Sequence, residues 1–544
     1  MKTPVLLLIA VCACGAAAQS TASTPAPAER LGTVSFATSC APAKQAAFNR
    51  GVALLHDFWY AEARQQFEQI AQADPGCAMA HWGIAMSVFH QIWDRPGENA
   101  MHFGWSEIRK AESLKAKTAR ERQYIAALGV FYKPGSEDYM ARVSAYSAAM
   151  DKLYRHYPDD VDAGAFYALS LLSAESPNDT SLTQQREAMA VLRPLFAKYP
   201  DNPGVVHYII HACDNPAMAS QGLKAAEHYG EIAPSGAHAA HMPGHIFARL
   251  GMWPQDIQAQ LASIAASEAA ERHHESGIMD EAHSYDFLMY AYLQSGQDAK
   301  AKAVIAEVDA VLKRVSAMPG GGHDLMSDRN GYYLTKFPVF YALETRDWKS
   351  AAALQPVAGA LPGQASMTWW ARAIADGHLR RAQQAQADLA QYDALIAQMR
   401  KGSDAYEADS TGAKIERDEI VAWVSFAAGK QYDAVANMRK AADLQDKVGQ
   451  GEVDIPAREM MGDMLLESHE PKMALAEYRI SLKLSPGRFN GLYHAGIAAE
   501  ESGDKAAAAR YYAALLKTTE GAEGALPQLA HARTFLAANQ TAEN

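Results

Sequence analysis

Residues 201–253 carry the most informative pattern in the chain: DNPGVVHYIIHACDNPAMASQGLKAAEHYGEIAPSGAHAAHMPGHIFARLGMW. This stretch contains two H-x3-H pairs, His207 with His211 and His241 with His245, and the second pair follows the first at an interval of 34 residues. Residues four apart lie on the same face of a helix. An interval of this length is typical of helix-turn-helix repeats, whose equivalent positions lie side by side when the units stack. The sequence therefore predicts stacked helical hairpins in which the four imidazoles converge on one surface.

A regular spacing of small, aromatic and proline residues recurs in three other segments of the chain. The residues are Gly51, Ala63, Phe67 and Pro75 counted from Lys44, then Gly462, Ala474, Tyr478 and Pro486 counted from Ile455, and Gly496, Ala508 and Tyr512 counted from Phe489. This pattern resembles that of tetratricopeptide-repeat proteins. The resemblance implies an all-α fold, a tetratricopeptide-repeat superhelix or α-solenoid of helical hairpins, with a concave groove along one side.

The histidine-rich region also resembles a subgroup of bacterial tetratricopeptide-repeat proteins that carry comparable histidine blocks. The matching stretches are HYIIHA, HMPGHIF and HSYDFLMYAYLQSGQ, and the resemblance covers residues 40–350. It implies the fold and no settled activity. In the family, certain positions of the first helix of each unit line the concave groove. The residues at these positions here are His207, His211, His238, His241, His245, His283, Asp286 and Tyr290.

Several neutral imidazoles in one place are typical of a transition-metal site, because each ring offers a nitrogen lone pair at about 2.0 to 2.1 Å from a zinc-like ion. Imidazole suits zinc, copper, iron and nickel. We therefore predict that the groove binds a divalent transition metal ion. The predicted ligands are His207, His211, His241 and His245, the further ligands or orienting partners are Asp214, His238, His283 and Asp286, and Tyr290 lines the groove. With an open coordination position, the protein could be a hydrolytic or oxidative enzyme.

Two other interpretations of the histidines stay open. A groove of histidine, aspartate and tyrosine side chains could bind a peptide carboxylate without metal, which would make the protein a scaffold for a protein, peptide or small-molecule partner. The same side chains could form a purely structural polar network. The sequence contains no H-E-x-x-H, G-x-S-x-G, P-loop or C-x-x-C pattern, so no local motif identifies a reaction.

Pro243 complicates the second histidine pair, because proline ends or kinks a helix. Either a helix begins at Pro243 and leaves His238 and His241 in the preceding turn, or one helix bends there. No proline lies between His207 and His211, so their spacing places both side chains on the same helix face.

The N-terminal residues predict export. Residues 1–18 begin with the basic Lys2, continue with an apolar run and end in small residues at Ala18, which is typical of a signal peptide. Residues 11–14, VCAC, also resemble a bacterial lipoprotein cleavage box, which would leave a lipid anchor on Cys14. We therefore expect a periplasmic or secreted protein. No later segment is apolar enough to be a transmembrane helix.

Composition predicts the organisation of the rest of the chain. Residues 19–42 are rich in Ser, Thr, Ala and Pro and predict a flexible leader. The further predicted parts are N-terminal repeats with the groove over 43–400, a loop over 401–414, C-terminal repeats over 415–536 and a disordered tail over 537–544.

The cysteines and the net charge limit the compartment and the partners. Cys40 and Cys77 bracket the first repeat, and an oxidising compartment would permit a disulfide between them, with two buried free thiols as the alternative. The net charge of −12 is spread along the chain without a long basic stripe. A nucleic acid partner is therefore not expected.

Overall fold

The computed structural model of the chain describes residues 29–92, 95–135, 138–176, 179–272, 278–316, 326–402, 405–449, 451 and 453–540. The regular secondary structure of these residues is helical, and no strand occurs among them. The all-α part of the prediction is therefore confirmed. The expected signal peptide of residues 1–18, the expected anchor Cys14 and residues 541–544 of the expected tail lie outside the described residues.

Consecutive helices pack against each other as hairpins along the chain. The N-terminal helices are η1 (Pro42–Lys44), α1 (Gln45–His56), α2 (Tyr60–Ala73), α3 (Ala78–Met86), α4 (Glu98–Ser113), α5 (Ala119–Tyr132), α6 (Tyr139–His156), α7 (Val161–Ser173) and α8 (Thr183–Lys198). The central helices are α9 (Pro203–Cys213), α10 (Ala219–Ile232), α11 (Ala237–His241), α12 (Pro243–Arg249), α13 (Trp253–Arg272), α14 (Ile278–Gln294), α15 (Asp298–Ser316) and α16 (Met326–Glu344). The C-terminal helices are α17 (Trp348–Ala353), α18 (Pro362–His378), α19 (Ala382–Met399), α20 (Ala405–Ala408), α21 (Thr411–Ala427), α22 (Gln431–Val448), α23 (Ala457–Glu467), α24 (Pro471–Leu484), α25 (Phe489–Glu501), α26 (Lys505–Thr518) and α27 (Pro527–Gln540).

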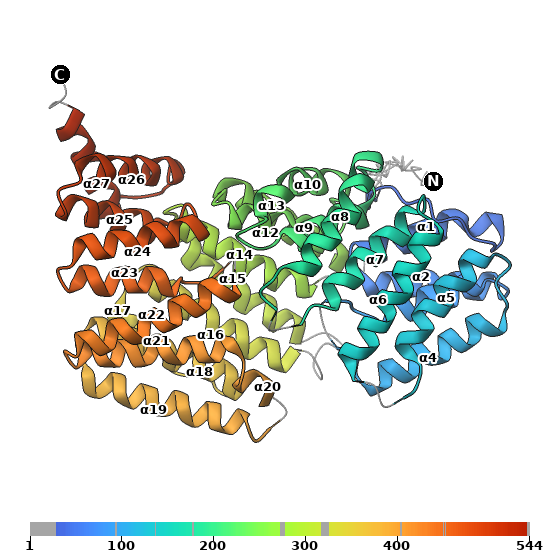
Figure 1. Cartoon of the computed structure of the whole chain (residues 1–544), viewed down its shortest axis with the longest axis horizontal. Helices are drawn as coiled ribbons and strands as arrows, with labels where there is room; N and C mark the ends of the chain where they lie inside the picture. The colour runs from blue at the N-terminus through green and yellow to red at the C-terminus, as the bar shows by residue number, and fades with distance from the viewer. Residues whose placement is uncertain are drawn as a thin grey trace, which may run out of the picture.

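In Figure 1 the helices α1–α6 lie towards one end of the molecule, and α21–α27 are stacked one above another at the other end. The stack also curves back on itself, because C-terminal segments contact the central helices. The indole Nε1 of Trp253 on α13 donates to the carbonyl of Gly487 at 2.8 Å, and the hydroxyl of Tyr290 on α14 donates to the carbonyl of Asp454 at 3.0 Å. The C-terminal hairpins therefore pack against the central helices α13 and α14.

Close packing between a glycine and an aromatic ring recurs within the hairpins. A Cβ atom on Gly51 of α1 would lie 2.7 Å from the Phe67 ring of α2, and one on Gly496 of α25 would lie 2.3 Å from the Tyr512 ring of α26. Real Cβ atoms do not approach so closely, so the ring fills the space that a side chain would need. These are the glycine and aromatic positions that the sequence spacing singled out.

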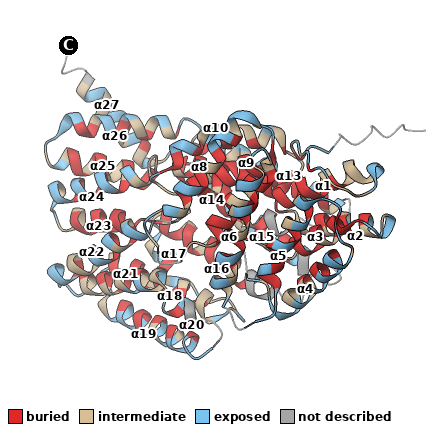
Figure 2. Cartoon of the chain, turned by 45° about the vertical axis from the view of Figure 1, so that its right-hand side comes forward, coloured by how far each residue is buried: buried red, intermediate tan, exposed pale blue. Residues whose placement is uncertain are grey.

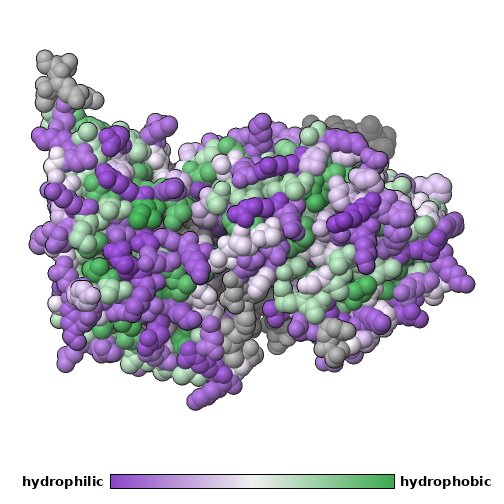
Figure 3. Space-filling view, viewed as in Figure 1, coloured by the Kyte–Doolittle hydropathy of each residue, from purple (hydrophilic) through white to green (hydrophobic). Residues whose placement is uncertain are grey.

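Buried apolar side chains form three large clusters, which extend over residues 31–166, 58–247 and 264–532. Buried residues follow α8, α9 and α14 through the middle of the molecule (Figure 2). On the face drawn in Figure 3, hydrophilic side chains are widely spread and hydrophobic ones form scattered groups between them. No described helix combines the length and the apolar composition that crossing a membrane requires.

The segment before α1 is packed against the first helices. Phe36 is fully buried, and its ring centroid lies 5.4 Å from that of Phe48, 5.5 Å from that of Trp82 and 5.0 Å from that of Tyr124. The prediction of a flexible leader over residues 19–42 is therefore wrong for its last part, around Phe36. Burial of the apolar Phe36 ring is favourable in free energy, and this holds the segment against the first helices.

Cys40 and Cys77 form a disulfide that joins this segment to the start of α3. The pairing was one of the two alternatives that the sequence left open. In the chain-entropy view, closing a loop of this length stabilises the folded state by roughly 3 to 4 kcal/mol.

Two other predicted boundaries also change. The predicted loop over 401–414 contains α20, and α21 already begins at Thr411, where the side chain of Ser410 accepts a hydrogen bond from the backbone N–H of Ala413. A serine N-cap satisfies a free N–H group and fixes the start of the helix. At the other end, α27 continues through Gln540, well into the predicted tail of residues 537–544.

Candidate metal centre

The sequence fixes α9 locally. The side chain of Asn202 caps the helix by accepting a hydrogen bond from the backbone N–H of Val205, and Pro203 occupies the first turn, where its missing N–H is not needed. Apolar residues surround the two histidines of α9 and are buried, and His207 is buried with them. His211, one turn later, is only partly buried. The helix therefore holds the His207 ring in the interior and directs the His211 ring towards the surface.

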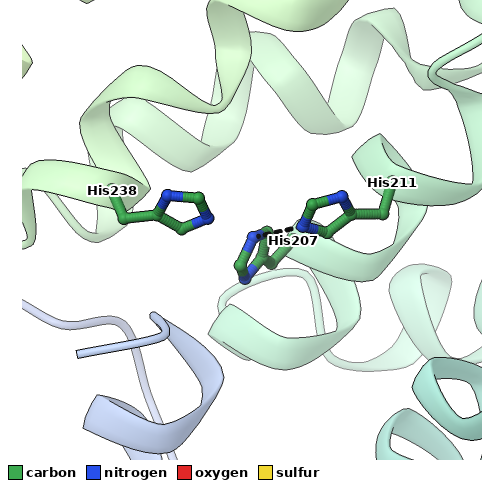
Figure 4. A group of neighbouring side chains, drawn as sticks. All are labelled: His207, His211 and His238. Carbon is green, nitrogen blue, oxygen red and sulfur yellow. Dashed lines mark hydrogen bonds between the residues drawn. The ribbon is translucent and has the colours of Figure 1, made fainter. Parts of the chain in front are cut away.

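His207, His211 and His238 form a first group, which we name cluster A. One ring nitrogen from each lies within 4.8 Å of the others. Figure 4 shows His238 approaching the two rings of α9 from a separate helix, with all three side chains directed at one another. The Nε2 atoms of His207 and His211 are 2.9 Å apart. The Nδ1 atom of His207 donates to the carbonyl of His56 at 2.6 Å, so its Nε2 atom carries the lone pair in the neutral ring.

Phe58 covers cluster A from the end of α1. Its ring centroid lies 4.5 Å from that of His207, 5.6 Å from that of His211 and 5.4 Å from that of His238. Burial disfavours the charged form and lowers the pKa of His207 to about 3, and it also lowers the pKa of His238 well below the ordinary value. Both rings are therefore neutral at physiological pH, and neutral imidazole is the form that binds metals.

The helix is interrupted at Met242, between α11 and α12, and Pro243 is the first residue of α12. Met242 nevertheless keeps helical dihedral angles, with φ −53° and ψ −36°. His241 on α11 and His245 on α12 therefore still face each other across the break. Both alternatives considered for Pro243 hold in part, because a new helix begins there but continues nearly the same path.

His241 and His245 form a second group with His283 of α14, which we name cluster B. One ring nitrogen from each lies within 4.8 Å of the others. The Nε2 atoms of His241 and His245 are 2.9 Å apart, as in cluster A. Their Nδ1 atoms face oxygen atoms, the side-chain carbonyl of Gln260 at 2.6 Å for His241 and the carboxylate of Asp214 at 2.9 Å for His245.

These oxygen atoms decide which nitrogen of each ring carries the proton. The Gln260 amide donates its N–H to the carboxyl of Asp256 at 2.7 Å, which leaves its carbonyl oxygen facing His241. Because both Nδ1 atoms face acceptors, the neutral rings of His241 and His245 are protonated at Nδ1. Their Nε2 lone pairs then point at each other across 2.9 Å. Two lone pairs repel at this distance unless a cation lies between them.

Gln260 reaches His241 because Gly244 has no side chain. A Cβ atom on Gly244 would lie 2.0 Å from the Gln260 Nε2 atom and 2.6 Å from the Asp256 Oδ1 atom. The glycine in the HMPGHIF block therefore permits the close approach of α12 to α13. This spacing brings the orienting amide against the cluster B ligand.

Asp214 connects cluster B to a cavity of about 570 Å³. One carboxylate oxygen accepts from His245, and the other accepts from the Nε atom of Arg249 at 2.9 Å. The cavity is lined by His211, Asp214 and Arg249 on one side and by residues 446–449, 451, 483 and 484 on the other. His211 of cluster A and Asp214, which contacts His245 of cluster B, thus line the same cavity. The cavity lies between the central helices and the C-terminal hairpins, so only the curvature of the stack creates it.

The structure separates the predicted site residues. The four histidines predicted as one set fall into two groups, because His238 joins His207 and His211 while His283 joins the other pair. Asp214 lies beside a histidine in an orienting position, as one of its two predicted roles requires. The predicted lining of the concave groove differs in part, since His207, His238 and His241 are buried while His211 and Asp214 line a cavity. The end of α1, which closes over cluster A, comes from more than 140 residues earlier in the sequence.

Two predicted residues belong to other contacts. Asp286 is buried and pairs with the ammonium group of Lys336. Tyr290, predicted to line the groove, is buried and accepts a hydrogen bond from Arg488. Both residues follow His283 at helical spacing, but the packing of α14 against α16 and α25 directs their side chains into the core.

Sequence reasoning missed three contributors: Phe58, the carbonyl of His56 and Gln260. None of them carries a local signal, because an aromatic residue, a backbone carbonyl and a glutamine are common in any helical protein. Three imidazoles per group can hold a transition metal ion and leave a coordination position for water or a ligand. The chain matches no protein-family model, and no curated protein matches its sequence.

Proposed function

We propose that this protein binds divalent transition metal ions through its clustered histidines. The observation that carries the proposal is the pair His241 and His245, whose Nε2 atoms are 2.9 Å apart while both Nδ1 atoms face acceptor oxygens. An added proton on one ring would relieve the repulsion between two lone pairs. It would not account for the third imidazole, His283, whose nitrogen lies within 4.8 Å of the other two. A metal ion bound between the rings would use all three imidazoles as ligands.

The distances fit such an ion. Two nitrogen atoms 2.9 Å apart, each bound at about 2.05 Å, would subtend an angle of about 90° at the ion. A small rotation of either ring opens this angle towards the tetrahedral value that zinc prefers. Copper, iron and nickel accept the smaller angle in square or octahedral geometry. The oxygen partners of the Nδ1 atoms are the orienting contacts that metal-binding histidines usually have.

The proposal extends to a metal-dependent reaction of the hydrolytic or oxidative class. Three protein ligands leave a position for water, and a bound ion lowers the pKa of that water towards neutrality. His211 and Asp214 line the cavity of about 570 Å³, which gives a small ligand or peptide access to the clusters. Arg249 holds Asp214 in place through the hydrogen bond to its carboxylate. These residues would position a ligand beside the ion.

Membership of the tetratricopeptide-repeat class and export to the periplasm or the medium are further parts of the proposal. The 34-residue interval between the histidine pairs and the glycine–aromatic packing of the hairpins support the class. The disulfide between Cys40 and Cys77 supports an oxidising compartment, because disulfides are rare in reducing ones.

Elemental analysis of the full chain, purified without a histidine tag, tests the metal proposal. We expect zinc, copper, iron or nickel in the wild type, and a clearly lower metal content in the double variant His241→Ala/His245→Ala, in which cluster B lacks two of its three imidazoles. The matched control is His228→Ala, because His228 is a half-exposed histidine of α10 that bonds to Asp201 outside both clusters. If the wild type contains no metal after reconstitution with each of the four ions, the proposal fails. The cavity would then be treated as a metal-free binding site for a peptide partner.

A further inference from the structure

The histidine nitrogens are organised as two separate donor sets. In cluster A the lone pair of His207 points at His211, and in cluster B the lone pair of His241 points at His245. His207 and His241 each have only one lone pair, because their Nδ1 atoms donate to the carbonyl of His56 and to the side chain of Gln260. Neither residue can therefore turn a second nitrogen towards the other cluster.

From this division we infer that the centre holds two metal ions, one in each cluster. The inference rests on the proposed function and deepens it. The third ligands, His238 and His283, come from different helices, α11 and α14. His238 and His241 are three residues apart on one short helix, and their ring centroids are 6.1 Å apart. The two ions would therefore be neighbours, with α11 supplying one ligand to each.

The two clusters differ in what surrounds their ligands. In cluster A, His207 donates to a neutral backbone carbonyl, and Phe58 covers the rings. In cluster B, His245 donates to the carboxylate of Asp214. A carboxylate partner raises the basicity of the ligating nitrogen and offsets part of the charge of a divalent ion. Cluster B should therefore bind its ion first and more tightly.

A titration of the metal-free full chain with Zn²⁺, followed by calorimetry and by elemental analysis, tests the inference. We expect two ions per chain in the wild type. The variants His211→Asn in cluster A and His283→Asn in cluster B should each bind one, and His228→Asn should bind two. Asp214→Asn should weaken the tighter step about 10-fold or more and leave the other step unchanged.

The possible outcomes separate the two claims. One ion in the wild type, lost in both cluster variants, would mean one shared site and would overturn the inference while leaving metal binding intact. No ion in the wild type would overturn the proposed function itself. Circular dichroism and thermal unfolding of each variant show whether a lost ion reflects a lost fold.

X-ray absorption on the wild type gives a test that needs no variant. With one and with two equivalents of Zn²⁺ bound, each zinc should have about three imidazole neighbours at about 2.0 Å. Four or more imidazoles around a single zinc, with no second binding step, would contradict the two-ion centre.

Discussion

At the scale of single residues, acceptor oxygens decide what the histidines can do. The carbonyl of His56, the amide oxygen of Gln260 and the carboxylate of Asp214 each accept a hydrogen bond from the Nδ1 atom of one ring. Each contact leaves an Nε2 lone pair directed into its cluster. The spacing of the histidines brings the rings together, but these oxygens leave the Nε2 lone pairs available to bind a metal ion.

Gln260 gives a direct test of this role. In Gln260→Leu, His241 loses the acceptor that fixes its tautomer and orientation, so the affinity of cluster B for Zn²⁺ should fall about 10- to 100-fold. The matched control is Gln258→Leu, because Gln258 is exposed on the same helix. Calorimetric titration of both variants measures the difference. Equal affinities for the two variants would show that the amide has no orienting role.

Phe58 combines a packing role with an unfavourable backbone conformation. It follows the end of α1 with φ 56°, in the left-handed region that usually holds glycine. Phe58→Ala and Phe58→Gly both remove the ring from cluster A, but only alanine keeps the backbone penalty. We expect both to destabilise the protein, and Phe58→Gly to be more stable than Phe58→Ala by about 1 kcal/mol. Urea unfolding of the metal-free variants measures this, and an alanine variant as stable as the glycine variant would contradict it.

At the scale of elements, the approach of α12 to α13 sets the geometry of cluster B. Gly244→Ala should displace the buried side chains of Gln260 and Asp256, because its Cβ atom would lie 2.0 Å from the Gln260 Nε2 atom and 2.6 Å from the Asp256 Oδ1 atom. We expect a loss of about 1 to 3 kcal/mol in the free energy of unfolding and weaker Zn²⁺ binding. Denaturant unfolding and calorimetry measure the two effects.

Gly230→Ala on α10 is the control for that substitution. Its Cβ atom would meet only Pro243 at 3.9 Å, an ordinary contact, and alanine is the better helix former by about 1 kcal/mol. Gly230→Ala should therefore be neutral or stabilising and should keep full affinity. If Gly244→Ala behaves in the same way, the close approach is not a requirement of the site.

At the scale of the whole molecule, the C-terminal hairpins are joined to the central helices by buried charges. Arg488 of the turn before α25 is buried and bonds to the carboxylates of Glu344 on α16 and Glu459 on α23. Breaking such a pair leaves an uncompensated buried charge, which costs several kcal/mol. Other residues of the C-terminal hairpins, 446–449, 451, 483 and 484, line the cavity beside His211 and Asp214.

Buried titratable groups in the C-terminal hairpins predict acid sensitivity. Burial, together with the nearby Arg346, lowers the pKa of His494 to about 3, although the carboxylate of Asp463 opposes this. In the unfolded chain this pKa is about 6.5. Between these values the unfolded state binds a proton that the folded state does not, so stability falls as the pH drops below 6.5.

Replacement of this histidine should reduce the effect. In His494→Gln the loss of unfolding free energy between pH 7 and pH 5 should be smaller than in the wild type by about 1 to 2 kcal/mol. Urea unfolding at the two pH values measures it. His469→Gln, at an exposed position, should leave the pH dependence unchanged. An unchanged slope in His494→Gln would show that this ring is not the source.

Patterns in the sequence were sufficient to predict the helical hairpins, the glycine–aromatic packing positions and the pairing of His207 with His211 and of His241 with His245. These follow from the period of the helix and of the repeat, which act between residues close in the chain. The division of the histidines into two clusters, the packing of Phe58 over one of them and the contact of Gln260 with a ring of the other became visible in the folded chain alone. Those contacts depend on how far the stack curves and on the break at Pro243. The curvature is the sum of small changes in angle between successive helices, and no local sequence pattern predicts that sum.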